Sequence, residues 1–353
     1  MGELFQKGGS AYLSGLVREA VENGTRCATV TGNWEIDEAI RLPSDFTVIL
    51  ADTHLRLADG SHTNIFVNEH NETALGKTPE GTDRNISIIG RGRAVLDGGE
   101  MNDVNERVPY DERVAPLHKN HLILFTNVDG FRLSGFRCIN QRYWAIAFYY
   151  SCNGYVGNID YLADDRWRDD DGTVRHGLVR AKSLGVLVKN ADGVDLRAGC
   201  HHITVENLTG FCEDDTVALT GLPGRTEETF RVEGLPSDIA YVTVRNIRTA
   251  SYCSNVRLLN QGDIKLHDIE IDGVYDESEA SPHLDHGNFT LRIGDRYLYG
   301  PRHCTAEETY NISVKNLYGR GIAVIATAGE IGNLTVENIS GGEGTPLYHD
   351  WES

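Results

Sequence analysis

Basic side chains are scarce in this sequence. It has 33 Lys and Arg against 52 Asp and Glu, which gives a formal net charge of −19 at pH 7. A protein that binds nucleic acid needs a basic face to neutralise phosphates. The composition therefore excludes a general nucleic-acid binder. A strongly acidic chain also repels polyanions, so an anionic substrate requires a locally basic cleft.

Long apolar runs are missing as well. No stretch of about 18 consecutive apolar residues is present, so we expect no membrane span. Residues 1–15 contain no apolar region of the kind found in signal peptides. We therefore expect a cytoplasmic protein, unless a signal peptide precedes this sequence.

The cysteines and histidines lack metal-binding patterns. The seven cysteines are odd in number and include no Cys-x-x-Cys pair, which is typical of small buried side chains rather than of a disulfide framework or a zinc site. The acidic loop at 164–171 lacks the spaced oxygen ligands of a calcium site. His283, His286, His303 and Cys304 show no ligand spacing either. We expect neither a metal nor another cofactor.

Helical periodicity occurs in one segment, residues 10–23, where apolar residues recur every three or four positions and Gly24 follows as a stop. The rest of the chain has the short apolar runs and turn residues of β structure, helped by 38 glycines. The first such runs cover 27–31, 39–42, 47–50 and 54–57.

A six-residue pattern then recurs: apolar, polar, apolar, polar, turn residue, apolar. Its copies begin at Ile86, Phe131, Ile203, Val242, Ile264, Ile312 and Leu334. The step is 22 residues from Val244 to Leu266 and again from Val314 to Val336. We interpret the longer intervals as multiples: three steps from Leu133 to Val205, and two each from Val205 to Val244 and from Leu266 to Val314. Strand–turn units with this period predict a parallel β-solenoid.

We expect one domain over residues 1–353. The helix at 10–23 should cap the open end of the first coil, and coils should follow over residues 24–345. Insertions near 163–180, 221–237 and 275–303 interrupt the period and are expected to build a binding face. Four asparagines fall at one place in the repeat and should stack along the axis: Asn207, Asn246, Asn316 and Asn338.

Two acidic clusters lie one such step apart. Asp192 and Asp195 form the first, and Glu213, Asp214 and Asp215 form the second. The spacing from Asp192 is 22 residues to Asp214 and 23 to Asp215. The clusters should therefore be stacked neighbours. Crowded carboxylates raise one another's pKa, so that one of them can stay protonated as an acid.

Several ordered motifs in residues 85–275 resemble glycoside hydrolase family 28, the polygalacturonase-like right-handed parallel β-helices with a pectin-lyase-like solenoid fold. They include Gly92-Arg-Ala-Val-Leu-Asp-Gly-Gly99, Asn190-Ala-Asp-Gly-Val-Asp195, Glu213-Asp-Asp215 and Asn255-Val-Arg-Leu-Leu259. The resemblance implies that Asp214 is the general acid, that Asp192 and Asp215 position and deprotonate water, and that Arg257 contacts the sugar. Such inverting hydrolysis uses two carboxyl groups about 6.5–9.5 Å apart.

Two departures from the family affect specificity. The region of the family's Gly-His-Gly motif contains no histidine in residues 230–237, and Leu259 stands where the family has lysine. Both missing residues belong to the family's galacturonate subsites. We therefore expect a glycosidase for a poly- or oligosaccharide whose sugar is undetermined, with uronate- or rhamnose-containing, pectin-like chains as candidates.

Further substrate-binding candidates are Asp195, Glu213, His201, His202, Trp144 and Arg292. The structural alternatives are turn formation for the acidic residues and the histidines, core packing for Trp144, and a surface charge for Arg257. Arg292 and Trp167 lie in or near insertions, where they could form a wall on which sugars stack. Two other functions stay open. One is lyase, transglycosylase or epimerase chemistry on the same fold, and the other is a non-catalytic, tailspike-like glycan binder. The expected partner is a carbohydrate, with neither nucleic acid nor membrane; a homo-oligomer is left open.

Overall fold

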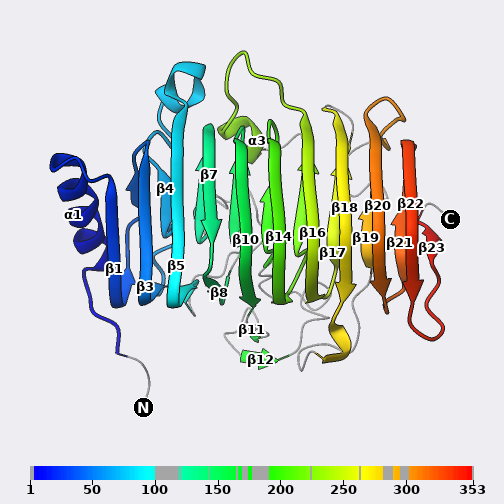
Figure 1. The fold of residues 1–353 in the computed structure, drawn as a ribbon, viewed down its shortest axis with the longest axis horizontal. Helices are drawn as coiled ribbons and strands as arrows, with labels where there is room; N and C mark the ends of the chain where they lie inside the picture. Colours follow the sequence, from blue (N-terminus) through cyan, green and yellow to red (C-terminus); the bar gives the residue numbers. More distant parts are fainter. Residues whose placement is uncertain are drawn as a thin grey trace.

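The chain forms a right-handed parallel β-helix, as the sequence predicts (Figure 1). The computed structural model describes residues 4–99, 119, 121–141, 143–163, 166–168, 174–176, 191–222, 225–261, 264–280, 289–294 and 302–351. The chain passes alternately through two long parallel sheets, so that each circuit of the chain adds one strand to each sheet. In Figure 1 the colours consequently run in order from one end of the molecule to the other.

The first sheet contains β1 (Cys27–Ile36), β3 (Phe46–Leu57), β5 (Asp83–Asp97), β7 (Val128–Ser134), β8 (Arg137–Ile139), β10 (Cys152–Leu162), β14 (His201–Cys212), β16 (Ile239–Ser251), β18 (Leu266–Asp276), β20 (Thr309–Gly319) and β22 (Gly332–Gly341). The second sheet contains β2 (Ile40–Leu42), β4 (Phe66–Asn68), β6 (Ile123–Thr126), β9 (Ile146–Tyr149), β13 (Val194–Leu196), β15 (Val217–Gly221), β17 (Ser254–Asn260), β19 (Phe289–Ile293), β21 (Ala323–Thr327) and β23 (Tyr348–Asp350).

Smaller elements lie in the connections. They are the antiparallel pair β11 (Arg166–Arg168) and β12 (Val174–His176), the short helix α3 (Arg225–Thr229), and the 3-10 turns η1 (Leu75–Lys77), η2 (Pro79–Gly81) and η3 (Ser278–Ala280). The pair β11–β12 falls in the expected insertion at 163–180, and α3 falls in that at 221–237. Most of the third expected insertion, together with His283 and His286, lies outside the described residues, as does most of the acidic loop at 164–171.

The core lies between the two sheets, where inward side chains of successive coils stack on one another. Ile203 and Val205 of β14, for example, pair in register with Val242 and Val244 of β16, and all four are almost fully buried. No coil could bury these side chains alone, because each apolar row is covered by the coils on either side. Stacking therefore supplies the hydrophobic stabilisation of the whole solenoid.

Coil length varies more than the sequence pattern predicts. Val205 pairs directly with Val244, so this 39-residue interval is one coil and not two. Leu133 reaches Val205 through Val156, in two coils and not three. The interval of 22 residues from Val314 to Val336 is one coil, as predicted. Insertions lengthen the other coils without changing the strand pairing, and a count of residues cannot separate one long coil from two short ones.

One predicted register is wrong by five residues. Val244 pairs with Ile271, and Leu266 pairs instead with Ile239. The reason is that β18, like β16, has two positions with left-handed backbone. In β18 they are Asp268 (φ 54°) and Gly273 (φ 78°). The six-residue sequence pattern aligns Asp268 with Asn246. In the structure, Gly273 is the residue of β18 that corresponds to Asn246.

The predicted asparagine stack is confirmed in two stretches. The Asn246 side chain donates to Asn207 (2.6 Å), and Asn207 donates to Asn158 (3.2 Å). Asn338 donates to Asn316 in the same way. Each of these asparagines has φ between 50° and 57°, a left-handed conformation that asparagine tolerates better than other residues with side chains.

Helix α1 (Gly9–Glu22) covers the open end of the first coil, in agreement with the predicted cap at 10–23 (Figure 1). Leu13, Val17 and Ala20 are buried against that coil. The Ser10 hydroxyl accepts hydrogen bonds from the main-chain N–H groups of Asp37 and Glu38, both at 2.9 Å, which fix the start of the helix to the end of β1. Among the described residues, no helix has the length and apolar character needed to cross a membrane.

We predict that Leu13→Ala lowers the free energy of unfolding by about 2–5 kcal/mol, because Leu13 is 1% exposed and its removal leaves a cavity over the first coil. Denaturant unfolding followed by circular dichroism measures the loss. Arg18→Ala, on the exposed side of the same helix, is the matched control and should change stability by less than about 0.5 kcal/mol. Equal effects of the two substitutions would contradict a capping role.

Candidate active site

Three predicted site residues, Asp195, Arg257 and Arg292, lie on the outer face of the second sheet. Asp195 in β13 points outward because its neighbours Val194 and Leu196 point into the core. The register places Ala218 of β15 beside Asp195, Arg257 of β17 beside Ala218, and Arg292 of β19 beside Arg257. Four successive coils thus present one outward row that contains one acid and two arginines.

The two acidic clusters are neighbours across one coil boundary, as their spacing predicts. The N–H of Gly193 donates to the carbonyl oxygen of Asp215 (3.0 Å), and the N–H of Asp215 donates to Oδ1 of Asp192 (3.2 Å). Glycine is needed at 193 because a Cβ there would lie 2.4 Å from the carbonyl oxygen of Thr216. The Asp-Gly pair therefore lets the second coil approach closely enough for these bonds to form.

Four aspartates of this cluster are almost completely buried: Asp192 (4% exposed), Asp195 (1%), Asp214 (8%) and Asp215 (7%). Burial raises the pKa of Asp192 well above its ordinary value, and the negative charges of Asp195, Asp214 and Asp215 raise it further. Burial likewise raises the pKa of Asp195, although the nearby Arg197 opposes this rise. The site therefore favours protonated carboxyl groups.

Among the neighbouring charges, that of Asp195 does most to raise the pKa of the Asp192 carboxyl. Within the described part of the chain, no N–H group and no hydroxyl donates to the Asp195 oxygens. Two buried carboxylates in such surroundings cannot both ionise easily, so the pair favours a state in which one carboxyl keeps its proton.

Asp215 has the opposite surroundings. The Ser254 hydroxyl donates to its Oδ1, and the Arg292 guanidinium lies 3.5 Å from its Oδ2. A hydroxyl donor and a cation both stabilise negative charge on the carboxylate. Asp214, its neighbour in sequence, is held through its main-chain carbonyl oxygen, which accepts from the Ser251 hydroxyl. The cluster thus combines two aspartates whose pKa values are raised with a third, Asp215, that has cationic support.

Trp351, which the sequence analysis did not select, covers both arginines. Its ring lies 4.9 Å from the Arg292 guanidinium carbon and 5.7 Å from that of Arg257, distances typical of cation–π contacts. Trp351 follows β23, and the register His349–Ala326 brings it to this face. Arg257 (4% exposed) and Arg292 (9%) are buried beneath it. No local sequence motif indicates a contact that spans several coils.

Arg197 borders the other side of the carboxyl cluster and was also missed. Its Nη1 lies 3.7 Å from Oδ1 of Asp195, and its Nε donates to Glu227 of α3 (2.9 Å). The Trp144 ring stacks beneath the Arg197 guanidinium at 4.3 Å and against His121 at 5.3 Å. Trp144 therefore reaches the carboxyl cluster only through Arg197. Strand alternation offers the missed signal, because Arg197 lies two residues after the outward Asp195.

His201 and His202 lie elsewhere. They begin β14 of the first sheet, after the chain has turned away from the second sheet. His202 has φ 54° and its ring packs on Tyr241, which has φ 56°, at 4.6 Å. His202 and Tyr241 occupy left-handed positions near the start of their strands, as Asn311 and Asn333 do further along the sheet. The expectation that these histidines line the cleft has no support in their position.

Glu213 supports the main chain beside the cluster. Its Oε2 accepts from the N–H of Ala191 (3.1 Å), the residue before Asp192. The bond ties the two acidic segments together a second time, next to the bond between Asp215 and Asp192. Glu213 therefore positions the carboxyl cluster from its edge.

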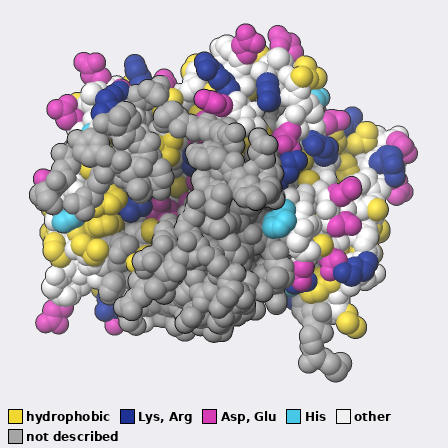
Figure 2. Space-filling model, turned by 180° about the vertical axis from the view of Figure 1, so that it is seen from behind, with side chains coloured by type: hydrophobic (Ala, Val, Ile, Leu, Met, Phe, Trp, Pro, Cys, Tyr) yellow, Lys and Arg dark blue, Asp and Glu magenta, His cyan; other side chains and the backbone are white. Residues whose placement is uncertain are grey.

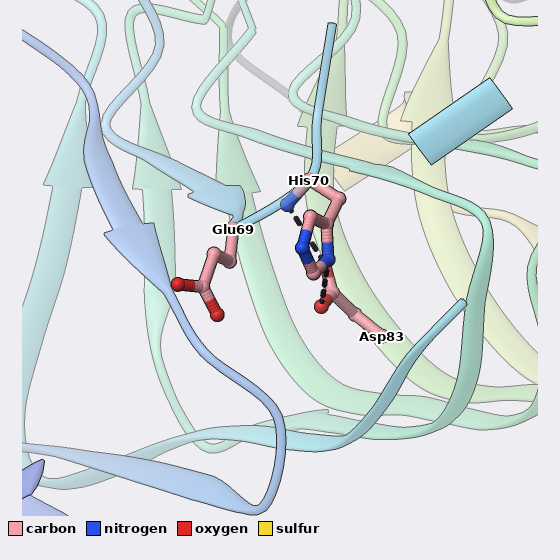
Figure 3. Close-up of side chains that lie close together, drawn as sticks. All are labelled: Glu69, His70 and Asp83. Carbon is pink, nitrogen blue, oxygen red and sulfur yellow. Dashed lines mark hydrogen bonds and ion pairs between the residues drawn. The ribbon is translucent and has the colours of Figure 1, made fainter. Parts of the chain in front are cut away.

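A different group, Glu69, His70 and Asp83, brings its potential ligand atoms within 4.8 Å of one another (Figure 3). Asp83 is fully buried, and its oxygens accept from the Asn68 amide (2.7 Å), the His70 N–H (2.9 Å) and the His70 ring (2.8 Å). The Glu69 carboxylate points away from this pair in Figure 3. These bonds describe a turn held by a buried carboxylate, and they leave Asp83 little capacity for a cation.

Acidic and basic side chains are interspersed over the described part of the face seen in Figure 2, with hydrophobic side chains between them. The excess of negative charge in the composition therefore does not collect there as a patch of one sign. Arg257 and Arg292 place two positive charges beside the carboxyl cluster.

Solved structures similar to this chain share its fold. An endo-xylogalacturonan hydrolase from Aspergillus tubingensis is 15% identical with a TM-score of 0.61, over 99% of this chain and 95% of the other. An iota-carrageenase complexed to iota-carrageenan fragments is 10% identical with a TM-score of 0.62, over 100% and 89%. A tailspike protein of E. coli bacteriophage HK620 in complex with a pentasaccharide is 13% identical with a TM-score of 0.57, over 96% and 60%. No family model and no curated protein matches the sequence.

We predict that Asp195→Asn makes the protein less sensitive to rising pH. Above the ordinary aspartate value of 3.8, an unfolded chain loses the proton that the folded Asp192–Asp195 pair retains. Stability should therefore fall as pH rises towards the raised folded pKa, by at most about 1.4 kcal/mol per pH unit for one proton. Asparagine at 195 has no titratable proton and removes the negative charge that raises the pKa of Asp192, so the variant loses part of this pH dependence.

Urea unfolding of both proteins at about pH 5 and about pH 7 measures the difference. The exposed substitution Asp37→Asn makes the same change of charge away from the pair and should leave the pH dependence as it is. Parallel pH profiles for the unmodified protein and Asp195→Asn would show that the pair holds no extra proton.

Proposed function

We propose that this protein is a glycoside hydrolase that acts on a poly- or oligosaccharide. The observation that carries the proposal is the convergence of four buried aspartates on one outer face, beside Arg257 and Arg292. Glycoside hydrolysis needs one carboxyl group that donates a proton and another that accepts one. The similar structures named above include two enzymes described as acting on polysaccharides, which supports the same class of substrate.

The proposed roles are those that the family resemblance implies, combined with the hydrogen-bond partners and charges around each carboxyl. Asp214 donates its proton to the glycosidic oxygen as the bond to the anomeric carbon breaks. Asp215, supported by Ser254 and Arg292, takes a proton from the water whose oxygen forms the new bond to that carbon. Asp192 holds this water, and the hydrogen bond that its Oδ1 accepts from the Asp215 N–H orients its carboxyl. Water attacks the face opposite the leaving group, so the anomeric configuration inverts.

The arginines favour a sugar that carries an anionic group. Leu259 occupies the place of the lysine found in the resembling family, and it points outward beside Thr220. Arg292 lies one coil further along and is in register with Arg257. A different strand therefore supplies a second cation where the family's lysine is absent. Two adjacent guanidinium groups suit a carboxylate or a sulfate, which can accept bidentate hydrogen bonds.

The test is turnover of a panel of uronate-containing, sulfated and neutral polysaccharides, followed by the release of reducing ends. We predict that Asp214→Asn lowers the rate on whichever polymer is cleaved by about 100- to 10,000-fold, because the amide cannot donate the proton. Asp37→Asn is the exposed control and should keep full activity.

NMR of freshly released sugar should show the inverted anomer, and a retained configuration would rule out the direct attack of water. Unchanged turnover by Asp214→Asn would remove the acid role from this residue. Products with near-ultraviolet absorbance would indicate elimination, the lyase alternative, in place of hydrolysis.

A second function, glycan binding without cleavage, is favoured by the near-complete burial of all four aspartates. A phage tailspike with bound pentasaccharide is among the similar structures. Binding of a polymer from the panel without any release of reducing ends would support this second function.

A further inference from the structure

The outer face of the second sheet changes character at β13. On the N-terminal side, the outward row runs through Val67 of β4, Leu124 of β6 and Ala147 of β9, all apolar and nearly inaccessible to solvent. At β13 the same row continues with Asp195. The carboxyl cluster therefore begins where an apolar surface ends.

A connecting segment covers this apolar surface. Residues 225–238, between β15 and β16, bring Phe230 (2% exposed) and Val232 (1%) into one hydrophobic cluster with Val67 and Leu124. The Phe230 ring lies 4.9 Å from that of Tyr149 on β9. In Figure 1 this segment, with α3, extends from β16 back over the neighbouring coils towards β7. Water and ligands are thus excluded from the sheet on this side.

Polar contacts hold the same segment at both ends. The N–H of Glu233 donates to the carbonyl oxygen of Lys77 (2.9 Å), several coils away. Ser237 bonds through its hydroxyl to that of Tyr150 (2.7 Å) and through its carbonyl oxygen to the N–H of Gly199 (2.9 Å). At the other end, Glu227 pairs with Arg197, which borders Asp195. The covering segment therefore begins beside the carboxyl cluster, because Arg197 contacts both Glu227 and Asp195.

We infer that residues 225–238 close the saccharide site on the N-terminal side of β13, so that the enzyme accepts the end of a glycan chain and cuts units from it. A chain cleaved in its interior must continue past the carboxyls in both directions. Here one direction is filled by Phe230, Val232 and the side chains beneath them. The inference rests on the proposed hydrolase activity and adds the mode of attack to it.

The test uses oligogalacturonides and iota-carrageenan oligosaccharides of defined length, each with a fluorescent label on the reducing end. Chain-end attack predicts that, at the start of the reaction, the unmodified protein converts a probe of one length into a labelled product of one fixed size. Phe230→Ser with Val232→Ser should open the blocked direction and add internal products that the unmodified protein does not form. Leu235→Ser, on the exposed side of the same segment, is the matched control and should leave the product pattern unchanged.

The outcomes separate the two proposals. Internal products of many sizes from the unmodified protein, at the earliest times, would overturn the chain-end inference and leave the hydrolase proposal standing. No cleavage of either probe, or of any polymer in the wider panel, would overturn the hydrolase proposal and this inference with it. A loss of folding by the double variant would not rescue the inference, because the product pattern of the unmodified protein decides it alone.

Discussion

Main-chain hydrogen bonding between successive coils is the constraint on which the rest of this structure depends. Neighbouring strands in a sheet lie about 4.8 Å apart, so a side chain on one coil has a fixed neighbour on the next. The outward row of the second sheet converts that regularity into chemistry. Asp195, Arg257 and Arg292 come from distant parts of the sequence, yet register alone places them in line. The site needs no mobile loop to assemble this row.

Burial gives the carboxyl groups different roles. An aspartate removed from water holds its proton more tightly unless a cation or donor stabilises its charge. Burial raises the pKa values of Asp192 and Asp195, whereas Asp215 has the Ser254 hydroxyl and the Arg292 guanidinium to stabilise a negative charge. Carboxyl groups of one chemical type thus stand in different electrostatic surroundings within one cluster. Such a division is what acid–base catalysis requires, and it destabilises the folded protein in return.

The sequence predicts the parts of the structure that short-range patterns control. The capping helix, the solenoid, the asparagine stack and the pairing of Asp192 with Asp215 all follow from local periodicity, and the coil between these two aspartates contains no insertion. The pattern fails where coils lengthen, as between Leu133 and Val205, because inserted residues add length without adding a strand. It also fails where Asp268 and Gly273 offer two similar turn positions five residues apart.

Contacts between distant coils were beyond reach for a different reason. The Arg197–Glu227 pair joins a strand to a covering segment, and Trp351 reaches Arg257 from the last coil. No periodicity specifies such contacts, because they depend on how far a connection extends over the surface. The histidines show a different error, because residues that are near in sequence were expected to be near in space. His201 and His202 are close to the aspartates in sequence, but the chain turns a corner between them and enters the other sheet.

The position of Trp351 bears on how this solenoid responds to change along its length. The stability of a repeat protein is approximately a sum of terms from each coil and its two neighbours. Trp351 departs from that rule, because its ring on the last coil covers arginines on β17 and β19, and Arg292 in turn pairs with Asp215 before β15. The site is therefore thermodynamically linked to the coil that contains β23. Local opening of that coil, which in a simple repeat array affects its neighbours alone, is here coupled to the electrostatics of the central carboxyl groups.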